Sequence, residues 1–137
     1  MITPVADTSF IVALGNAAEK SHVACEVVKR GEEVIIVPQT VLAEVGYLFT
    51  QRLGNRAMAN FLRALPETKY RIMALESVDF VRTAELLEKY TDSRVDFVDA
   101  TVAALAERLQ VKRILTIDQR DFQILRPKHV DHFELLP

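Results

Sequence analysis

Apolar residues along this chain gather in short continuous runs, and stretches of mixed polarity separate these runs. The runs at residues 2–6, 33–37, 70–75 and 113–117 have the apolar, partly β-branched character that is typical of strands. Residues 132–135 form a fifth, shorter run and predict a final strand. Because several runs are continuous rather than alternating, we expect a parallel sheet that is covered on both faces.

Between these strand candidates, apolar residues recur every three or four positions, which indicates helices. The predicted helices cover residues 10–14, 18–30, 40–53, 55–65 and 77–90, and a last one runs to about Leu109. Gly31, Gly54 and Pro66 follow three of these segments at positions where helices commonly stop. Strands that alternate with helices predict an α/β fold, a three-layer sandwich with a central parallel sheet of about five strands.

The length and composition of the chain fit one globular unit. Its 137 residues suffice for a proper core, and half of them are hydrophobic while 26% are charged. We therefore expect a single domain over residues 1–137. Cys25 is the only cysteine, which excludes an internal disulfide and a cysteine-based zinc site. With no signal-peptide pattern and no run long enough to span a membrane, the expected location is the cytoplasm.

The charge of the whole chain gives no sign of a nucleic-acid binder. The formal net charge is −2 and the isoelectric point is about 5.9, whereas such domains are often strongly basic. Residues 52–71 differ from the rest, because they hold five basic side chains against Glu67 alone. The five are Arg52, Arg56, Arg63, Lys69 and Arg71. We interpret this segment either as a solvated helix face or as a surface that contacts a polyanion.

Four acidic residues stand where acids are locally out of place. Asp7 and Asp118 close the first and fourth strand candidates, and Glu44 and Asp99 each interrupt the apolar stripe of a predicted helix. An unpaired buried carboxylate is costly or gives up its charge, so each of these positions requires compensation. No basic residue occupies a corresponding core-facing position, which suggests that a divalent cation is the partner.

The predicted fold brings these four acids to one place. In an open parallel sheet, ligands bind beyond the carboxyl ends of the strands. If the strands before Asp7 and Asp118 are neighbours, their side chains meet there, and helices that begin at the same edge add Glu44 and Asp99. An all-oxygen site suits Mg²⁺ or Mn²⁺. One or two such cations can orient a water and neutralise charge on a phosphate oxygen, which is the chemistry of phosphodiester hydrolysis.

Neighbouring hydroxyls add to this hypothesis. Thr8 and Thr116 stand beside the strand-end acids, and we expect their hydroxyls to hold the carboxylates or the attacking water. Taken alone, an aspartate placed like Asp7 is more often a helix N-cap, and one placed like Asp118 is often a turn residue after a strand.

Two further acids have simpler interpretations. We interpret Asp96 as a capping acid in the first turn of the last helix, within a capping box over residues 93–96, and Asp121 as a turn or N-cap residue. Glu44 and Asp99 do not fit a capping role if each lies a turn or more inside its helix. For these two, the alternative to a metal is a salt bridge to a buried arginine.

Four segments in this order resemble PIN-domain ribonucleases of the VapC-like toxin type, and the resemblance extends over essentially the whole chain. The segments are Val5-Ala6-Asp7-Thr8-Ser9, Val41-Leu42-Ala43-Glu44-Val45, Val98-Asp99-Ala100-Thr101-Val102-Ala103-Ala104-Leu105-Ala106 and Leu115-Thr116-Ile117-Asp118-Gln119-Arg120-Asp121-Phe122. The resemblance implies a five-stranded parallel α/β sandwich that acts as a Mg²⁺- or Mn²⁺-dependent RNA endonuclease. It also implies a cognate antitoxin that covers the active site, and a homodimer.

The same resemblance assigns roles residue by residue. Three groups match: the acidic quartet Asp7, Glu44, Asp99 and Asp118, the hydroxyl positions Thr8 and Thr116, and Asp96 as an acid often seen near the site. The RNA-binding surface is not marked by a motif, and residues 52–71 are our candidate for it. The sequence does not indicate which RNA is cut, because RNA recognition depends on loops and exposed bases.

Two other functions are compatible with parts of this pattern. A receiver-like regulatory domain also has acids at strand ends, one of which is phosphorylated, but it needs an acidic pair after its first strand. Here Thr8 and Ser9 follow Asp7. The second alternative is a PIN-like protein that binds RNA or a partner without cleaving, against which the intact acidic quartet argues.

Overall fold

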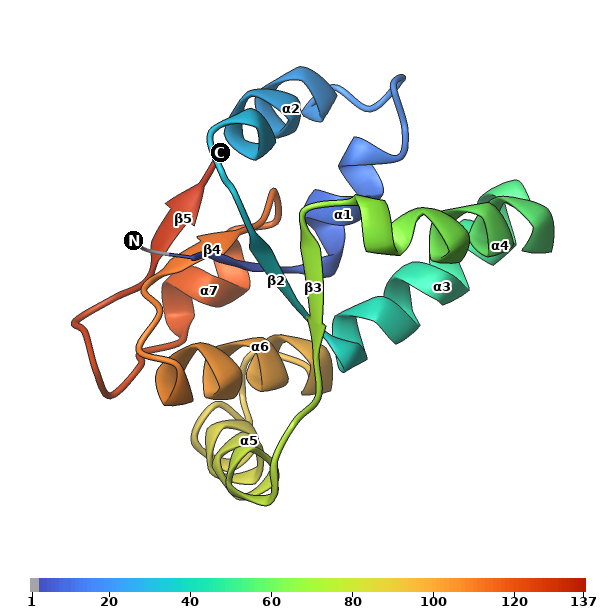
Figure 1. The fold of residues 1–137 in the computed structure, drawn as a ribbon. Helices are drawn as coiled ribbons and strands as arrows, with labels where there is room; N and C mark the ends of the chain where they lie inside the picture. The colour runs from blue at the N-terminus through green and yellow to red at the C-terminus, as the bar shows by residue number, and fades with distance from the viewer. Residues whose placement is uncertain (1–2) are drawn as a thin grey trace.

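The structure is a computed structural model that describes residues 3–137. A central sheet of five parallel strands has helices on both faces, α1 and α2 on one side and α5 and α6 on the other (Figure 1). The strands are β1 (Val5–Ala6), β2 (Ile35–Pro38), β3 (Tyr70–Met73), β4 (Arg113–Leu115) and β5 (Glu134–Leu136), and their order is β3-β2-β1-β4-β5. This confirms the predicted fold class.

The helices agree with the predicted segments except at their ends, and one additional short helix was not predicted. They are α1 (Thr8–Leu14), α2 (His22–Arg30), α3 (Gln39–Leu53), α4 (Asn55–Ala64), α5 (Ser77–Lys89), α6 (Phe97–Arg108) and α7 (Arg120–Ile124), with a 3₁₀ turn at Leu65–Glu67. The prediction was wrong for residues 18–21, which lie before α2, and for residues 120–124, which form α7 rather than a turn. The predicted first strand began at residue 2, which lies outside the described residues.

The core lies around the two inner strands and helix α6. Val5, Ala6 and Ile35 are fully buried, and in α6 every residue from Asp99 to Ala106 is buried. Helix α6 packs on β1 and β2 and is covered in turn by α5, so it has no broad solvent face. Alanines at four of these positions let the backbone approach its neighbours closely. They are Ala100, Ala103, Ala104 and Ala106.

Helices α3 and α4 form a hairpin that extends to one side of the sheet (Figure 1). Gly54 joins them with a φ of +89°, a left-handed conformation that a residue with a Cβ rarely adopts. Gly46 faces Met58 across the hairpin, and a Cβ at residue 46 would lie 3.2 Å from the Met58 Cε atom. The hairpin carries Arg52 at the end of α3. Within the described residues, no helix has the length and apolar character needed to cross a membrane.

Candidate functional site

A pocket of about 450 Å³ lies where β1 and β4 end. Its lining brings together all four acids that the sequence marked, from four separate parts of the chain. The charged residues of the lining are Asp7, Glu19, Glu44, Asp96, Asp99, Asp118, Asp121, Arg52 and Arg94. Seven acids against two arginines make this pocket strongly negative. Among the predicted hydroxyl residues, Thr8 also lines the pocket, whereas Thr116 lies behind it.

Asp7 reaches the pocket because β1 and β4 are neighbours. Ala6 pairs with Leu115, and the Asp7 backbone N–H donates to the Leu115 carbonyl at 2.9 Å. The Asp7 residue is 6% exposed, and its Oδ2 accepts from the Thr116 hydroxyl at 3.1 Å. Asp7 does occupy the N-cap position of α1, but its side chain makes no capping hydrogen bond. Its carboxylate is therefore held by side-chain contacts, one of them from Thr116, which is distant in the chain, and not by a regular N-cap bond.

Ser9 is a site residue that the sequence interpretation missed. Its hydroxyl donates to Asp7 Oδ2 at 3.3 Å, lies 3.0 Å from Thr116 Oγ1 and accepts from the Ile117 N–H at 3.0 Å. The Thr8 hydroxyl, which we expected to hold a carboxylate or the attacking water, is buried and makes no hydrogen bond to any residue from 3 to 137. The signal for Ser9 was its place two residues after Asp7, in the same helical turn.

Asp96 and Asp99 form a capping box at the start of α6. Asp96 is the N-cap, and its Oδ1 accepts from the Asp99 N–H at 2.9 Å, while Asp99 Oδ2 accepts from the Asp96 N–H at 3.3 Å. The predicted box over residues 93–96 is therefore wrong. So is the statement that Asp99 has no capping role, because α6 begins later than expected and places Asp99 in its first turn.

Asp118 and Asp121 share one arginine. Arg94 Nη2 lies 3.8 Å from Asp118 Oδ2, and Arg94 Nε lies 3.3 Å from Asp121 Oδ1. Asp121 is 7% exposed and lies in the first turn of α7, whose N-cap is Gln119, so our interpretation of Asp121 as a turn or N-cap residue was wrong. Asp118 is more open, with its side chain 44% exposed, and Arg120 Nε is 3.7 Å from its other oxygen. The guanidinium of Arg94 thus bridges two acids of the pocket.

The acids of the pocket raise one another's pKa. Burial raises the pKa of Asp7 to about 6, and the charge of Glu44 adds to this, although hydrogen bonds from the Thr8 N–H and the Thr116 and Ser9 hydroxyls oppose it. Burial also raises the pKa of Asp99 to about 9, with further contributions from Asp96, Asp121 and Asp7. A site in which carboxylates resist ionisation lacks enough positive charge of its own.

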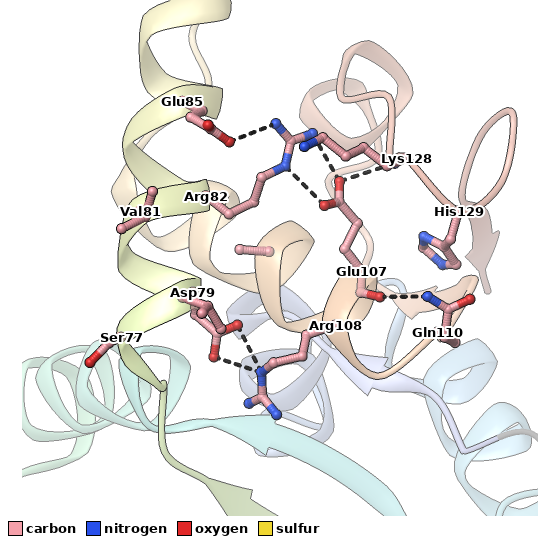
Figure 2. A pocket seen from close by; sticks show the side chains of 12 residues that line it. Ser77, Asp79, Val81, Arg82, Glu85, Glu107, Arg108, Gln110, Lys128 and His129 are labelled. Atoms are coloured by element: carbon pink, nitrogen blue, oxygen red, sulfur yellow. Dashed lines mark hydrogen bonds and ion pairs between the residues drawn. The ribbon is translucent and has the colours of Figure 1, made fainter.

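A buried acid elsewhere in the molecule shows what full pairing looks like. Asp79 is 1% exposed in a second pocket between α5 and α6, and both of its carboxylate oxygens accept from Arg108 Nε, at 2.9 and 3.1 Å (Figure 2). In the same pocket, Arg82 binds Glu107 with two hydrogen bonds. We considered a salt bridge to an arginine as an alternative for Asp99, and the structure shows such a salt bridge at Asp79 instead.

The donors around the pocket suit a hard cation. They are carboxylate and hydroxyl oxygens, which Mg²⁺ and Mn²⁺ prefer. One of them, Asp121 Oδ1, is buried and makes no hydrogen bond within residues 3–137, and its partner there is the Arg94 guanidinium at ion-pair distance. Within residues 3–137, no three acidic, histidine or cysteine side chains are close enough to form a finished metal cage. The acids therefore line the pocket, but their side chains do not converge on one point.

The fold and this pocket define a class: a parallel α/β protein with an acidic pocket at the carboxyl edge of its sheet. A sequence model of the PIN domain matches residues 5–126. The chain belongs to the PIN domain family. Its strand order, 3-2-1-4-5, also differs from the order 2-1-3-4-5 of a receiver-like domain, which argues against that alternative.

Individual relatives resemble the chain along almost its whole length. It is 32% identical over 134 residues to Ribonuclease VapC26 of Mycobacterium tuberculosis, which covers 97% of this chain and 99% of the relative. The solved structure of VapC20 from the same species, described as a sarcin-ricin loop cleaving toxin, has a TM-score of 0.78 at 25% identity and covers 87% and 92% of the two chains. VapBC2 of Rickettsia felis, crystallised with a promoter DNA fragment, has a TM-score of 0.71 at 18% identity over 100% of both chains, which shows a shared fold.

Proposed function

We propose that this protein is a divalent-metal-dependent endoribonuclease and the toxin of a toxin–antitoxin pair. The observation that carries the proposal is the meeting of Asp7 and Asp99, from β1 and α6, in a pocket whose acids outnumber its arginines. A relative at 32% identity is named a ribonuclease, and a structural relative at 25% identity is described as a sarcin-ricin loop cleaving toxin.

The proposed metal ligands are Asp7, Glu44, Asp99 and Asp118, with Asp96 at the edge of the site, and the proposed ion is Mg²⁺ or Mn²⁺. When bound, the ion supplies positive charge that stabilises charge developing on a phosphate oxygen. The chain's own groups arrange the acids. The Ser9 and Thr116 hydroxyls fix Asp7 beyond β1, and the Asp96 backbone N–H orients the Asp99 carboxylate.

The partners follow from the same proposal. The substrate is RNA, and a cognate antitoxin is the protein partner, since several structural neighbours are toxin–antitoxin complexes, among them complexes from Klebsiella pneumoniae and Salmonella typhimurium. A homodimer and a cytoplasmic location, where RNA is available, complete this proposal.

Purified, antitoxin-free protein is expected to cleave RNA only when a divalent cation is present. The test incubates it with transfer, ribosomal and messenger RNAs in Mg²⁺, in Mn²⁺ and in excess chelator, and then restores the metal. We expect cleavage to stop on chelation and to return with Mg²⁺ or Mn²⁺, because the pocket acids otherwise repel the phosphate. Cleavage that continues in chelator at an unchanged rate contradicts the proposal.

The basic segment at residues 52–71 is the proposed RNA surface, and the structure links one of its members to the site. Arg52 lines the acidic pocket, and Arg56 lies in the first turn of the next helix, α4. Lys69 is less available, because its Nζ donates to the Lys29 carbonyl at 2.8 Å. The hairpin of α3 and α4 therefore presents basic side chains beside the acids.

Changing both Arg52 and Arg56 to Gln is expected to weaken RNA binding and reduce its salt dependence. Each phosphate contact that is lost lowers the slope of log affinity against log salt by about 0.7 for a single strand. Binding of a short labelled RNA at several salt concentrations measures this slope. Lys89→Gln, on α5 and outside the pocket lining, is the matched control. Equal slopes for the unsubstituted protein, the double variant and the control would show that Arg52 and Arg56 do not contact RNA.

A further inference from the structure

Arg94 differs from the other basic residue of the acidic pocket. Of the two arginines that line it, Arg52 and Arg94, only Arg94 lies within ion-pair distance of pocket acids in the part of the chain that the structure describes. Arg120, which is outside the lining, also lies 3.7 Å from Asp118. Arg94 spans Asp118, beyond β4, and Asp121, in α7. These acids come from a different segment of the chain, so tertiary structure alone creates the contact.

The Arg94 side chain is held, but loosely. It is 52% exposed, and its two ion-pair distances are 3.8 and 3.3 Å. The arginine hydrogen bonds that hold Asp79 and Glu107 are shorter, at 2.9 to 3.1 Å. Arg94 precedes α6 in a segment without regular structure, and the helix starts at Phe97. Such a guanidinium can turn from one anion to another without disturbing the core.

Asp118 is a proposed metal ligand, and it therefore has two competing positive partners. A divalent cation in the pocket takes up the charge that Arg94 now balances, and it also repels the guanidinium. The released side chain keeps its planar fork of donors, whose geometry matches a phosphate with two hydrogen bonds. It is then placed at the rim of a pocket whose acids are already compensated.

We propose that Arg94 is an RNA-binding residue with two positions. It is the internal counter-ion of Asp118 and Asp121 when the pocket holds no metal, and it binds a substrate phosphate when a divalent cation replaces it. This inference rests on the proposed nuclease function. It predicts opposite effects of one substitution, because removing the arginine favours metal and disfavours RNA.

The first measurement needs no RNA. Titration of the protein with Mn²⁺ by calorimetry gives the metal dissociation constant, and Arg94→Met is expected to tighten it by roughly tenfold by removing a nearby positive charge. Arg126→Met is the matched control, since the Arg126 guanidinium donates to the Gln123 carbonyl and lies outside the pocket lining. We expect its metal affinity to stay within about twofold of the unsubstituted protein.

The second measurement is RNA cleavage at saturating Mg²⁺. Arg94→Met is expected to lower kcat/KM by roughly 10- to 100-fold, mainly through KM, which is the range for one lost charge-assisted hydrogen bond. Arg94→Lys, which keeps the charge but not the fork, is expected to recover part of this loss. A thermal unfolding curve of each variant checks that the fold is intact.

The two measurements separate the possible failures. If the unsubstituted protein binds Mn²⁺ and cleaves RNA but Arg94→Met changes neither, the role of Arg94 is refuted while the nuclease function stands. Weaker metal binding in Arg94→Met also refutes it, because that result indicates a purely structural arginine. If the unsubstituted protein neither binds metal nor cleaves RNA, the proposed function and this inference fall together.

Discussion

Asp99→Asn is expected to abolish RNA cleavage, with kcat/KM at least about 1,000-fold lower at saturating Mg²⁺. The amide oxygen of asparagine can still accept from the Asp96 N–H, so the capping box and the start of α6 are preserved. What disappears is the ability of residue 99 to ionise, and the negative charge that results is the part of Asp99 that a divalent cation requires. We expect Asp7→Asn to act in the same way, from the opposite wall of the site.

Single-turnover cleavage of a labelled RNA measures this loss, and the unfolding temperature reports on the fold. The matched control is Asp92→Asn, in the exposed loop before α6, which removes an equal charge outside the pocket lining. We expect full activity from the control. A fully active Asp99→Asn protein would end the interpretation of this pocket as a metal-dependent active site.

Asp7→Asn is expected to stabilise the metal-free protein, raising its free energy of unfolding by about 3 kcal/mol at pH 8. The folded protein raises the pKa of Asp7 from 3.8 to about 6, chiefly by burial, so the charged form of this residue opposes folding. Asparagine has the same shape and accepts the same hydrogen bonds from Thr116 and Ser9, but carries no charge. Such an increase in stability would indicate that Asp7 serves function at the expense of stability.

The pH dependence of the free energy of unfolding tests the same prediction independently. Because the folded state holds the Asp7 proton to a higher pH than the unfolded state does, the stability due to neutral Asp7 is complete below about pH 4. It is lost as the pH rises from about 4 to about 6, and no further change comes from this group above that range. The Asp7→Asn protein should therefore lack the decrease in stability that Asp7 causes within this pH range.

Urea unfolding at a series of pH values, with chelator and with saturating Mg²⁺, measures both effects. With chelator, the substituted protein should be the more stable one. With Mg²⁺ the order should reverse or the difference should shrink, because only the unsubstituted protein gains the full free energy of metal binding. A substituted protein that is less stable in both solutions would show that Asp7 is a structural residue.

The sequence carried most of the information about the fold. Five apolar runs marked five strands, and their continuous character indicated a buried parallel sheet, because strands covered on both faces need no polar side. The errors lie at element ends and in α7, a helix of five residues over Arg120–Ile124. Such a helix is too short to show a periodic stripe, so its existence depends on the burial of Asp121 and Phe122 against the rest of the molecule.

The candidate site divides in the same way. Asp7, Glu44, Asp99 and Asp118 were visible because each breaks a local apolar pattern, and a residue out of place can be recognised without coordinates. Ser9, Asp121 and Arg94 break no pattern, since serine, aspartate and arginine are ordinary at a helix start or in a loop. Their roles arise from contacts across the chain, such as the hydrogen bond between the Ile117 N–H and Ser9.

The sequence by itself thus determined which segments form the sheet and which acids lie at its carboxyl edge, because both depend on local patterns of polarity. Tertiary structure alone decided that β1 lies beside β4, that Asp99 both caps α6 and faces the pocket, and that Arg94 bridges Asp118 and Asp121. These features depend on distances between residues that are far apart in the chain, and such distances are fixed only when the sheet and its covering helices pack together.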